Sequence, residues 1–229
     1  MNKTKIRSGR AGENSVTYFL EGSVVGYRAI RDKDGTIRVI EIIPYDSISA
    51  DLSLLRFYGM ILLLYLIRKS VLTFNLPTWL YHIPTIYWIG YLIKSVIEIW
   101  KKPETLKYHG AEHKIANWFN KNAQDDEIKE IQKYSRIHLR CGTNLYGTII
   151  LFQIIASISF AFFNYHITEF VTSILPLFLY TSFPFNILGL LIQFITTSEP
   201  LDEHVEVAYA AISEALKHPN QMVSYTSAE

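Results

Sequence analysis

The amino-acid sequence predicts a mainly α-helical, multispan membrane protein of about four spans, with a small β-rich unit at its N-terminus. Hydrophobic residues make up 49% of the 229 residues and charged residues 19%, below the roughly 25% that is usual in soluble domains. Four long apolar stretches divide the chain, at residues 52–67, 79–100, 145–163 and 170–195. Because a soluble protein of this length rarely contains four such stretches, we expect membrane spans rather than buried core helices.

The polar N-terminal segment, residues 1–50, is expected to form the β-rich unit on the cytoplasmic side. Residues 15–20 and 22–30 are rich in β-branched and aromatic side chains, as strands are. The sequence Asp32-Lys33-Asp34-Gly35 is typical of a hairpin turn. We therefore expect residues 36–43 to return as a third strand.

Residues 51–100 are expected to hold two spans. The stretch 52–67 is short, but Arg56 and Arg68 near its ends can extend toward the lipid headgroups. The stretch 79–100 has 22 residues and would form a helix of about 33 Å, which matches a hydrocarbon core of about 30 Å. A tryptophan at each end of this stretch is typical of the aromatic belts of membrane proteins.

One or two further spans are expected within residues 144–197. The stretch 145–163 is long enough for a single span. The stretch 170–195 is longer than an upright span needs, and it contains Pro176 and Pro184, which kink or break helices. It is therefore either a kinked, tilted span or a bent pair of half-helices.

A polar helical connection, residues 101–143, joins the two pairs of spans. Pro103 can open a helix that ends near Asn120. A second helix, capped by the Asp125-Asp126 pair, should run to about Tyr134. The polar tail, residues 198–229, is expected to contain an amphipathic helix with a shared apolar stripe at Val205, Tyr209, Ile212 and Leu216.

The distribution of lysine and arginine predicts a cytoplasmic location for both termini and for the connection. Eight of these residues fall in 1–50 and nine in 101–143, whereas 164–169 has none, and cytoplasmic segments carry the excess of such charges. Arg68 and Lys69 conflict with this orientation because they fall on the opposite side. We expect a multi-pass protein of the inner (cytoplasmic) membrane, with the lipid bilayer and a membrane protein as partners. With 22 Lys+Arg against 21 Asp+Glu, the chain shows no basic footprint for nucleic acid.

The sequence His109-Gly110-Ala111-Glu112-His113 has the H-x-x-E-H spacing of a zinc site. Residues four apart lie on the same face of a helix, so His109 and His113 can point at one ion. In such sites two histidines hold the metal and the glutamate, here Glu112, acts as the catalytic base. Five residues on their own are weak evidence for a metal.

Two more candidate ligands, His138 and Cys141, follow within 30 residues. Neutral imidazole and thiolate both suit Zn²⁺, so zinc is the expected cofactor. If His109, His113, His138 and Cys141 all bind, the site is closed and structural. If three bind, water can occupy the fourth position and catalysis becomes possible. The alternative is a network of hydrogen bonds that holds the connection together without metal.

Polar neighbours of these ligands are expected to orient them. Arg140 and Thr143 flank Cys141, and Glu199 can reach the site from the end of the last apolar stretch. The residues around Glu199 also suit a helix terminator, because Pro200 prevents continuation. A thiol-nucleophile role for Cys141, activated by His138 and Arg140, is a further alternative, although nothing in the sequence marks an acyl or disulfide substrate.

Three motifs occur in order along the chain: Tyr108-His109-Gly110-Ala111-Glu112-His113-Lys114, His138-x-Arg140-Cys141-Gly142-Thr143, and Gln193-x-x-Thr196-Thr197-x-Glu199-Pro200. Together they resemble the YqhQ-like family of bacterial membrane proteins, over roughly residues 104–215. Leu139 departs from this pattern, because the family usually has proline there. The resemblance implies a membrane protein of unknown function that is often labelled a metal-dependent enzyme.

Two classes of function follow. The first is a metal site on the cytoplasmic face of the membrane, with the chemistry of a metal-dependent hydrolase. The second is a non-catalytic accessory or scaffold subunit of a membrane protein assembly, in which the motifs act structurally. A transporter fits less well, because the apolar stretches lack acidic or histidine residues at mid-span.

Overall fold

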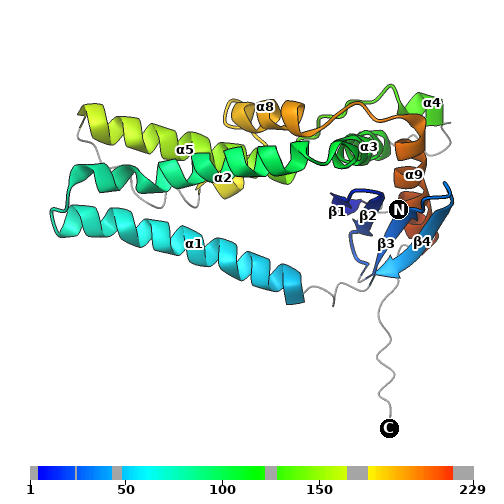
Figure 1. Cartoon of the computed structure of the whole chain (residues 1–229), viewed down its shortest axis with the longest axis horizontal. Coiled ribbons are helices and arrows are strands. Elements are labelled where there is room, and N and C mark those ends of the chain that lie inside the picture. Colours follow the sequence, from blue (N-terminus) through cyan, green and yellow to red (C-terminus); the bar gives the residue numbers. More distant parts are fainter. Residues whose placement is uncertain (1–4, 24, 43–47, 122–127, 164–174, 219–229) are drawn as a thin grey trace, which may run out of the picture. The chain divides into compact units, whose positions relative to one another are not determined.

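The structure is a computed structural model that describes residues 5–23, 25–42, 48–121, 128–163 and 175–218. The chain is mainly helical, with one small antiparallel sheet (Figure 1). It divides into two compact units. The first, called the polar unit below, comprises residues 1–47, 99–138 and 196–229, and the second, the helical unit, comprises residues 48–98 and 139–195.

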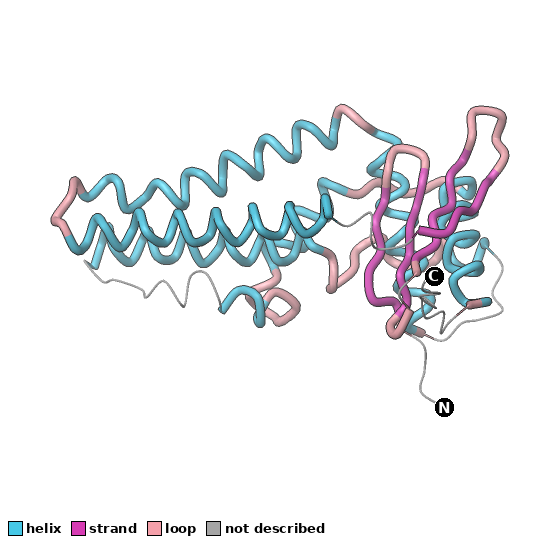
Figure 2. Tube along the Cα trace, turned by 90° about the horizontal axis from the view of Figure 1, so that it is seen from below, coloured by secondary structure: helices cyan, strands magenta, loops and turns pink. Residues whose placement is uncertain are grey.

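The sheet of the polar unit has four antiparallel strands in sequence order, which Figure 2 draws in magenta. The strands are β1 (Ile6–Ala11), β2 (Ser15–Leu20), β3 (Gly26–Arg31) and β4 (Ile37–Ile42). The predicted turn joins β3 to β4: the Asp32 N–H donates to the Thr36 carbonyl at 2.9 Å, and Gly35 has a φ of +88°, a conformation that glycine adopts without strain. The three expected strands are confirmed in type, and β1 is an additional strand.

Two helices cover this sheet and build the core of the polar unit. They are α3 (Pro103–Asn120) and α9 (Asp202–Lys217), and α4 (Ile128–Ile131) lies against them. α9 contacts β2, β3 and α3. Fully buried apolar side chains of the sheet, α3 and α9 pack together in one core: Val16, Ala29, Ala111, Ile115, Val205, Ala208 and Ile212. Burial of this apolar surface is the main term that stabilises the unit.

The helical unit contains six helices among the described residues. They are α1 (Ile48–Thr73), the 3₁₀ helix η2 (Thr78–His82), α2 (Ile83–Trp100), α5 (Gly142–Phe163), α7 (Leu175–Leu179) and α8 (Ile187–Thr196). Glycines bring α5 and α8 into backbone contact, because a Cβ on Gly147 would collide with the backbone of Gly189. The helices therefore pack closely at this crossing.

One described helix, over residues 142–162, is long and apolar enough to cross a membrane. The prediction of about four spans is therefore not confirmed. The stretch 79–100 begins as η2 and becomes α-helical only at Ile83. From residue 175 on, the stretch 170–195 forms α7 and α8 with turns between them around Pro184, so its described part is two short helices rather than one kinked span. Residues 170–174 and the Asp125-Asp126 cap lie outside the described residues.

Candidate metal centre

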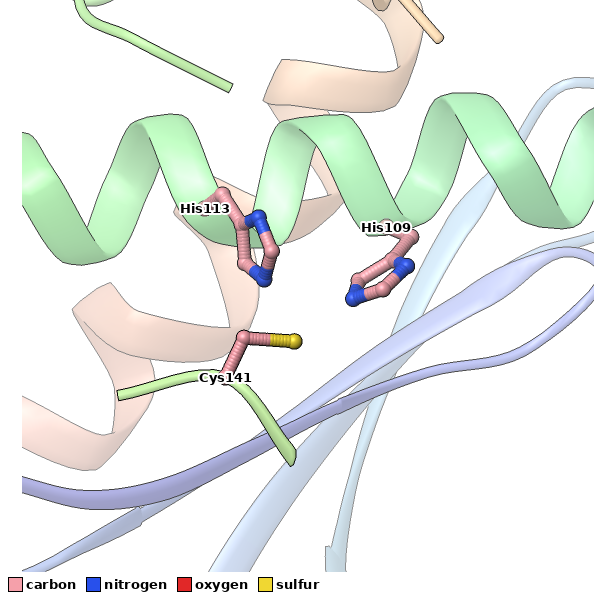
Figure 3. Close-up of side chains that lie close together, drawn as sticks. All are labelled: His109, His113 and Cys141. Carbon is pink, nitrogen blue, oxygen red and sulfur yellow. The ribbon is translucent and has the colours of Figure 1, made fainter. Parts of the chain in front are cut away.

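His109 and His113 lie one turn apart on the same face of α3, as Figure 3 shows. Their ring centroids are 4.4 Å apart, and a ring nitrogen of each lies within 4.8 Å of one on the other. The predicted i, i+4 pair is thus present in the fold. Zn–N bonds are about 2.0–2.1 Å long, so two nitrogens on one zinc ion lie at most about 4.2 Å apart, and small rotations of the two rings would meet this condition.

Backbone carbonyls fix how the two rings are oriented. Nδ1 of His109 is 3.1 Å from the Thr196 carbonyl oxygen, and Nδ1 of His113 is 2.7 Å from that of Arg136. A carbonyl oxygen only accepts hydrogen bonds, so in each ring Nδ1 carries the proton and donates. In the neutral ring Nε2 is then the nitrogen with the lone pair that a metal needs.

Burial favours the neutral form of both histidines. It lowers the pKa of His109, and it lowers the pKa of His113 well below the ordinary value, with His109 nearby as a second cause. Desolvation disfavours the charged form, so both rings are neutral near pH 7. Neutral imidazole is the form that binds metal.

Gly110, between the two histidines, lets the segment 196–200 pass directly against α3. A Cβ at this position would collide with the carbonyl oxygen of Ser198 and lie 3.3 Å from Cδ of Pro200. The Ser198 N–H donates to the Leu106 carbonyl at 3.0 Å, which ties the segment to the helix. This contact places the Thr196 carbonyl where it accepts the hydrogen bond from Nδ1–H of His109.

A second set of contacts holds the Arg136 carbonyl that His113 uses. The guanidinium of Arg136 donates to the carbonyl and hydroxyl of Thr197. Lys114, almost fully buried, donates to the carbonyls of Gln132 and Tyr134 at 2.5 and 2.9 Å and pairs with Glu199 at 2.5 Å. Glu199 also lies 3.7 Å from Nε of Arg136. The expected partner Glu199 thus contacts the basic residues around the histidines.

Sequence reasoning missed Lys114 and Arg136 as parts of this arrangement. One signal was available for Lys114: the residue belongs to the apolar side of α3 formed by Ala111, Ile115 and Trp118, all buried. A lysine at such a position needs buried acceptors. Arg136 lies in a loop, where the sequence gives no periodic pattern to indicate burial.

Glu112 lies against the first strand of the sheet. A Cβ on Gly9 would collide with its Oε1, and the hydroxyl of Tyr18 donates to its backbone carbonyl at 3.0 Å. Burial raises the pKa of the Glu112 carboxyl to about 8, partly opposed by a hydrogen bond from the Ala11 backbone. The carboxyl is therefore mostly protonated at pH 7 in the metal-free protein.

The remaining candidates follow on the segment 138–143. The His138 ring is 5.7 Å from the His113 ring, and its Nε2 is 3.5 Å from Nδ2 of Asn120. Arg140 is exposed. Cys141, labelled in Figure 3, is a half-buried free thiol whose sulfur accepts a 3.1 Å hydrogen bond from the Thr143 hydroxyl. His138 is the final residue of the segment 99–138 of the polar unit, and Cys141 belongs to the helical unit.

A family model described as "Protein of unknown function (DUF1385)" matches residues 82–188 and 149–218. These matches include both histidines of α3, the segment 138–143 and α9. The chain belongs to the DUF1385 family. Its description names no reaction and no metal, so the label of a metal-dependent enzyme gains no support from it.

The "Uncharacterized protein YqhQ" of Bacillus subtilis (strain 168) is similar to this DUF1385 chain. The two are 32% identical over 135 residues, which cover 48% of this chain and 40% of that relative. The resemblance to YqhQ-like proteins is therefore confirmed, while the chain matches less than half of the relative's length. No solved structure matches the chain.

Proposed function

We propose that this DUF1385 protein is an integral membrane protein that binds zinc through His109 and His113. The observation that carries the proposal is the pair of Nδ1–H donations to the carbonyls of Thr196 and Arg136. Metal-binding histidines almost always donate their other ring N–H in this way, which fixes the tautomer and the direction of the ligand nitrogen.

We include Cys141 as the third ligand. It follows His138 by three residues, and three residues of chain span at most about 10 Å, while the His138 ring packs 5.7 Å from that of His113. Nitrogen and sulfur ligands suit zinc, whereas magnesium prefers oxygen. His138 is the candidate for a fourth ligand.

The number of ligands decides the chemistry. Three protein ligands leave one position for water, and zinc lowers the pKa of such a water enough to give a nucleophile at neutral pH. A hydrolase role therefore depends on His138 staying outside the coordination shell. Glu112 remains the proposed proton-transfer residue of such a reaction.

A second candidate function is that of a scaffold in a membrane assembly. The observation that favours it is the set of contacts that the almost fully buried Lys114 and the partly buried Arg136 make with the exposed Glu199, which connects three parts of the chain through side chains. In this case the histidines would serve the same purpose as these contacts. The presence of metal separates the two candidates.

The proposed arrangement in the membrane rests on how the polar unit is assembled. Its three segments, 1–47, 99–138 and 196–229, pack into one core, so they lie on the same side of any membrane. Residues 48–98 and 139–195 must then each cross an even number of times. The helical unit exposes large apolar side chains that suit lipid, among them Leu62, Leu63, Ile86, Ile93, Ile158, Phe162, Leu191 and Phe194. The lysine and arginine counts favour the cytoplasm for the polar unit.

The metal proposal is tested by elemental analysis of protein purified without chelator. We expect about one zinc per chain, on the single-site interpretation. His113→Ala and Cys141→Ser should each lower the zinc content at least tenfold, since each removes a ligand. His218→Ala is the matched control, because its ring stacks on Tyr27 elsewhere in the polar unit. A wild-type protein that carries no transition metal, and whose melting temperature does not rise with added zinc, would leave the scaffold as the better proposal.

A further inference from the structure

We propose that Asn144 and Gln193 are positioning residues that hold the turn carrying Cys141. This inference rests on the proposed metal site, because it concerns how one of its ligands is placed. Both residues lie in the helical unit, on α5 and α8, and both side chains are fully buried. Neither residue is part of the H-x-x-E-H motif.

Asn144 donates hydrogen bonds to the backbone carbonyls of the residues before and after Arg140. Its side-chain Nδ2 donates to the Leu139 carbonyl at 2.6 Å, and its backbone N–H donates to the Cys141 carbonyl at 3.0 Å. One residue at the start of α5 thus binds the carbonyls of both Leu139 and Cys141. The backbone from Leu139 to Cys141 has little freedom while both bonds are present.

Gln193 fixes the orientation of the Asn144 amide. Its Nε2 donates to Oδ1 of Asn144 at 2.6 Å, so the Nδ2 of Asn144 must face Leu139. A flipped Asn144 amide would set one NH₂ group against another and leave the Leu139 carbonyl without this donor. In a buried site such a loss costs more than the bond itself contributes.

The close crossing of α5 and α8 brings these two amides together. A Cβ on Gly189 would collide with Cα of Asn144, so the absence of a side chain there allows the approach. Thr148 strengthens the same crossing, because its hydroxyl lies 2.8 Å from the Asn144 carbonyl and 3.1 Å from that of Phe185. The position of Cys141 is therefore set from α8, through Gln193, Asn144 and the Leu139 carbonyl.

The test compares Gln193→Leu with a matched control, Gln153→Leu, in the full chain. Gln153 is also a buried glutamine of the helical unit, but it lies twelve residues after Cys141, about 18 Å along α5. Both variants lose a buried amide, so both should lower the melting temperature. Only Gln193→Leu should disturb the turn.

The first readout is metal binding, measured with zinc and with cobalt. Loss of a residue that orients a metal ligand typically costs 10–100-fold in metal affinity. We expect that loss, with a weaker sulfur-to-cobalt charge-transfer band, for Gln193→Leu, and less than a twofold change for Gln153→Leu. Wild-type affinity and an unchanged band in Gln193→Leu would overturn the inference while leaving the metal site intact.

The second readout does not depend on metal. Cys141 is the only cysteine in the sequence, so its rate of alkylation by a maleimide in chelator-treated protein reports on this turn alone. We expect the rate to rise at least fivefold in Gln193→Leu and to stay within twofold of the wild type in Gln153→Leu. If the wild type binds no metal, the metal proposal fails and this comparison still decides the inference. Equal alkylation rates in both variants would show that Gln193 serves helix packing and not the turn.

Discussion

Gly110, between the proposed ligands His109 and His113, leaves room for another segment of the chain to pack against α3. The segment 196–200 crosses α3 at this position, and it supplies the carbonyl that orients His109. A larger residue would push away the acceptor rather than the histidine itself. The glycine of the H-x-x-E-H motif therefore belongs to the site even though it offers no ligand atom.

Gly110→Ala is expected to destabilise the protein and to weaken metal binding together. Overpacking of this kind costs typically 1–3 kcal/mol, and about 1 kcal/mol corresponds to roughly 2–4 °C in melting temperature for a chain of this size. Thermal unfolding and zinc content in the same preparations measure both effects. Gly90→Ala is the control, since a Cβ there meets nothing within 4 Å and alanine favours the helix. An unchanged melting temperature for Gly110→Ala would contradict a close contact between α3 and Ser198.

The Glu104 carboxylate provides a pH-dependent contribution to the stability of the polar unit. It accepts hydrogen bonds from Lys107 and from the buried His204, both at 2.8 Å. The bond from Lys107, followed by that from His204, lowers the pKa of Glu104 below its ordinary value. A carboxyl with a lowered pKa stabilises the fold above its unfolded-state pKa, and this stabilisation is lost as the pH falls through the folded-state pKa.

Glu104→Gln should therefore lower the melting temperature at pH 7, and the difference should shrink below pH 4.5. Because the carboxylate is half exposed, solvent screening reduces its contribution to about 0.5 kcal/mol, or one to two degrees. Melting curves at a series of pH values measure this, with Glu130→Gln as the control that removes an exposed pair with Lys133. A difference that grows as the pH falls would contradict the assignment.

At the scale of the elements, Arg68 joins the helices of the helical unit. Its side chain is almost fully buried, with Nε 3.2 Å from the Tyr81 carbonyl and a terminal nitrogen 3.2 Å from the Thr85 hydroxyl. Thr85 Oγ1 in turn lies 2.9 Å from the Gln153 carbonyl, so α1, η2, α2 and α5 share one polar network. Arg68, one of the two charges that conflicted with the orientation rule, thus faces the interior of the bundle.

Arg68→Lys should destabilise the helical unit by about 2 kcal/mol or more. The planar guanidinium of Arg68 reaches two acceptors and lies 4.7 Å from the centre of the Tyr81 ring. An ammonium group cannot reproduce this geometry. Thermal unfolding in detergent is the measurement. The neighbouring Lys69 is exposed, so Lys69→Gln should change the melting temperature by less than a degree. Equal effects of the two substitutions would argue against the network.

The elements also show what the sequence could and could not reveal. Strands β2 and β3 have buried apolar side chains, and the turn before β4 contains Gly35, so the sequence pattern predicted these three strands. Strand β1 was missed because its four middle residues are exposed and polar, and pairing with β2 holds it in place instead. The i, i+4 spacing of His109 and His113 predicted their shared face. The position of Glu112 against Gly9 depends on packing between distant segments, which local patterns do not encode.

At the scale of the whole molecule, the polar unit constrains the path of the chain. Because its three segments share a core, any membrane crossing by residues 48–98 must be followed by a return, and the same holds for residues 139–195. This requirement is independent of how apolar each helix is. It supports an even number of crossings more directly than hydropathy does.

Single cysteines introduced in a Cys141→Ser background test this arrangement. We expect a cysteine at Asn122 to be protected from a membrane-impermeant maleimide in intact cells, and one at His166 to be labelled. Opening the cells should expose position 122. Labelling of position 122 from outside would overturn the cytoplasmic assignment of the polar unit, and equal protection of both positions would contradict a crossing by α5.

The contribution of α9 to the core has a consequence for how the protein is made. Val205, Ala208 and Ile212 fill the space between the sheet and α3, so the N-terminal strands cannot reach their final packing until α9 leaves the ribosome. At roughly 5–20 residues per second, the sheet waits on the order of ten seconds after its own synthesis. During that time its apolar face is open to chaperones and proteases, while the segments between β4 and α9 are being synthesised. A chain cut short before α9 would keep that face open permanently, and quality-control proteolysis should remove it.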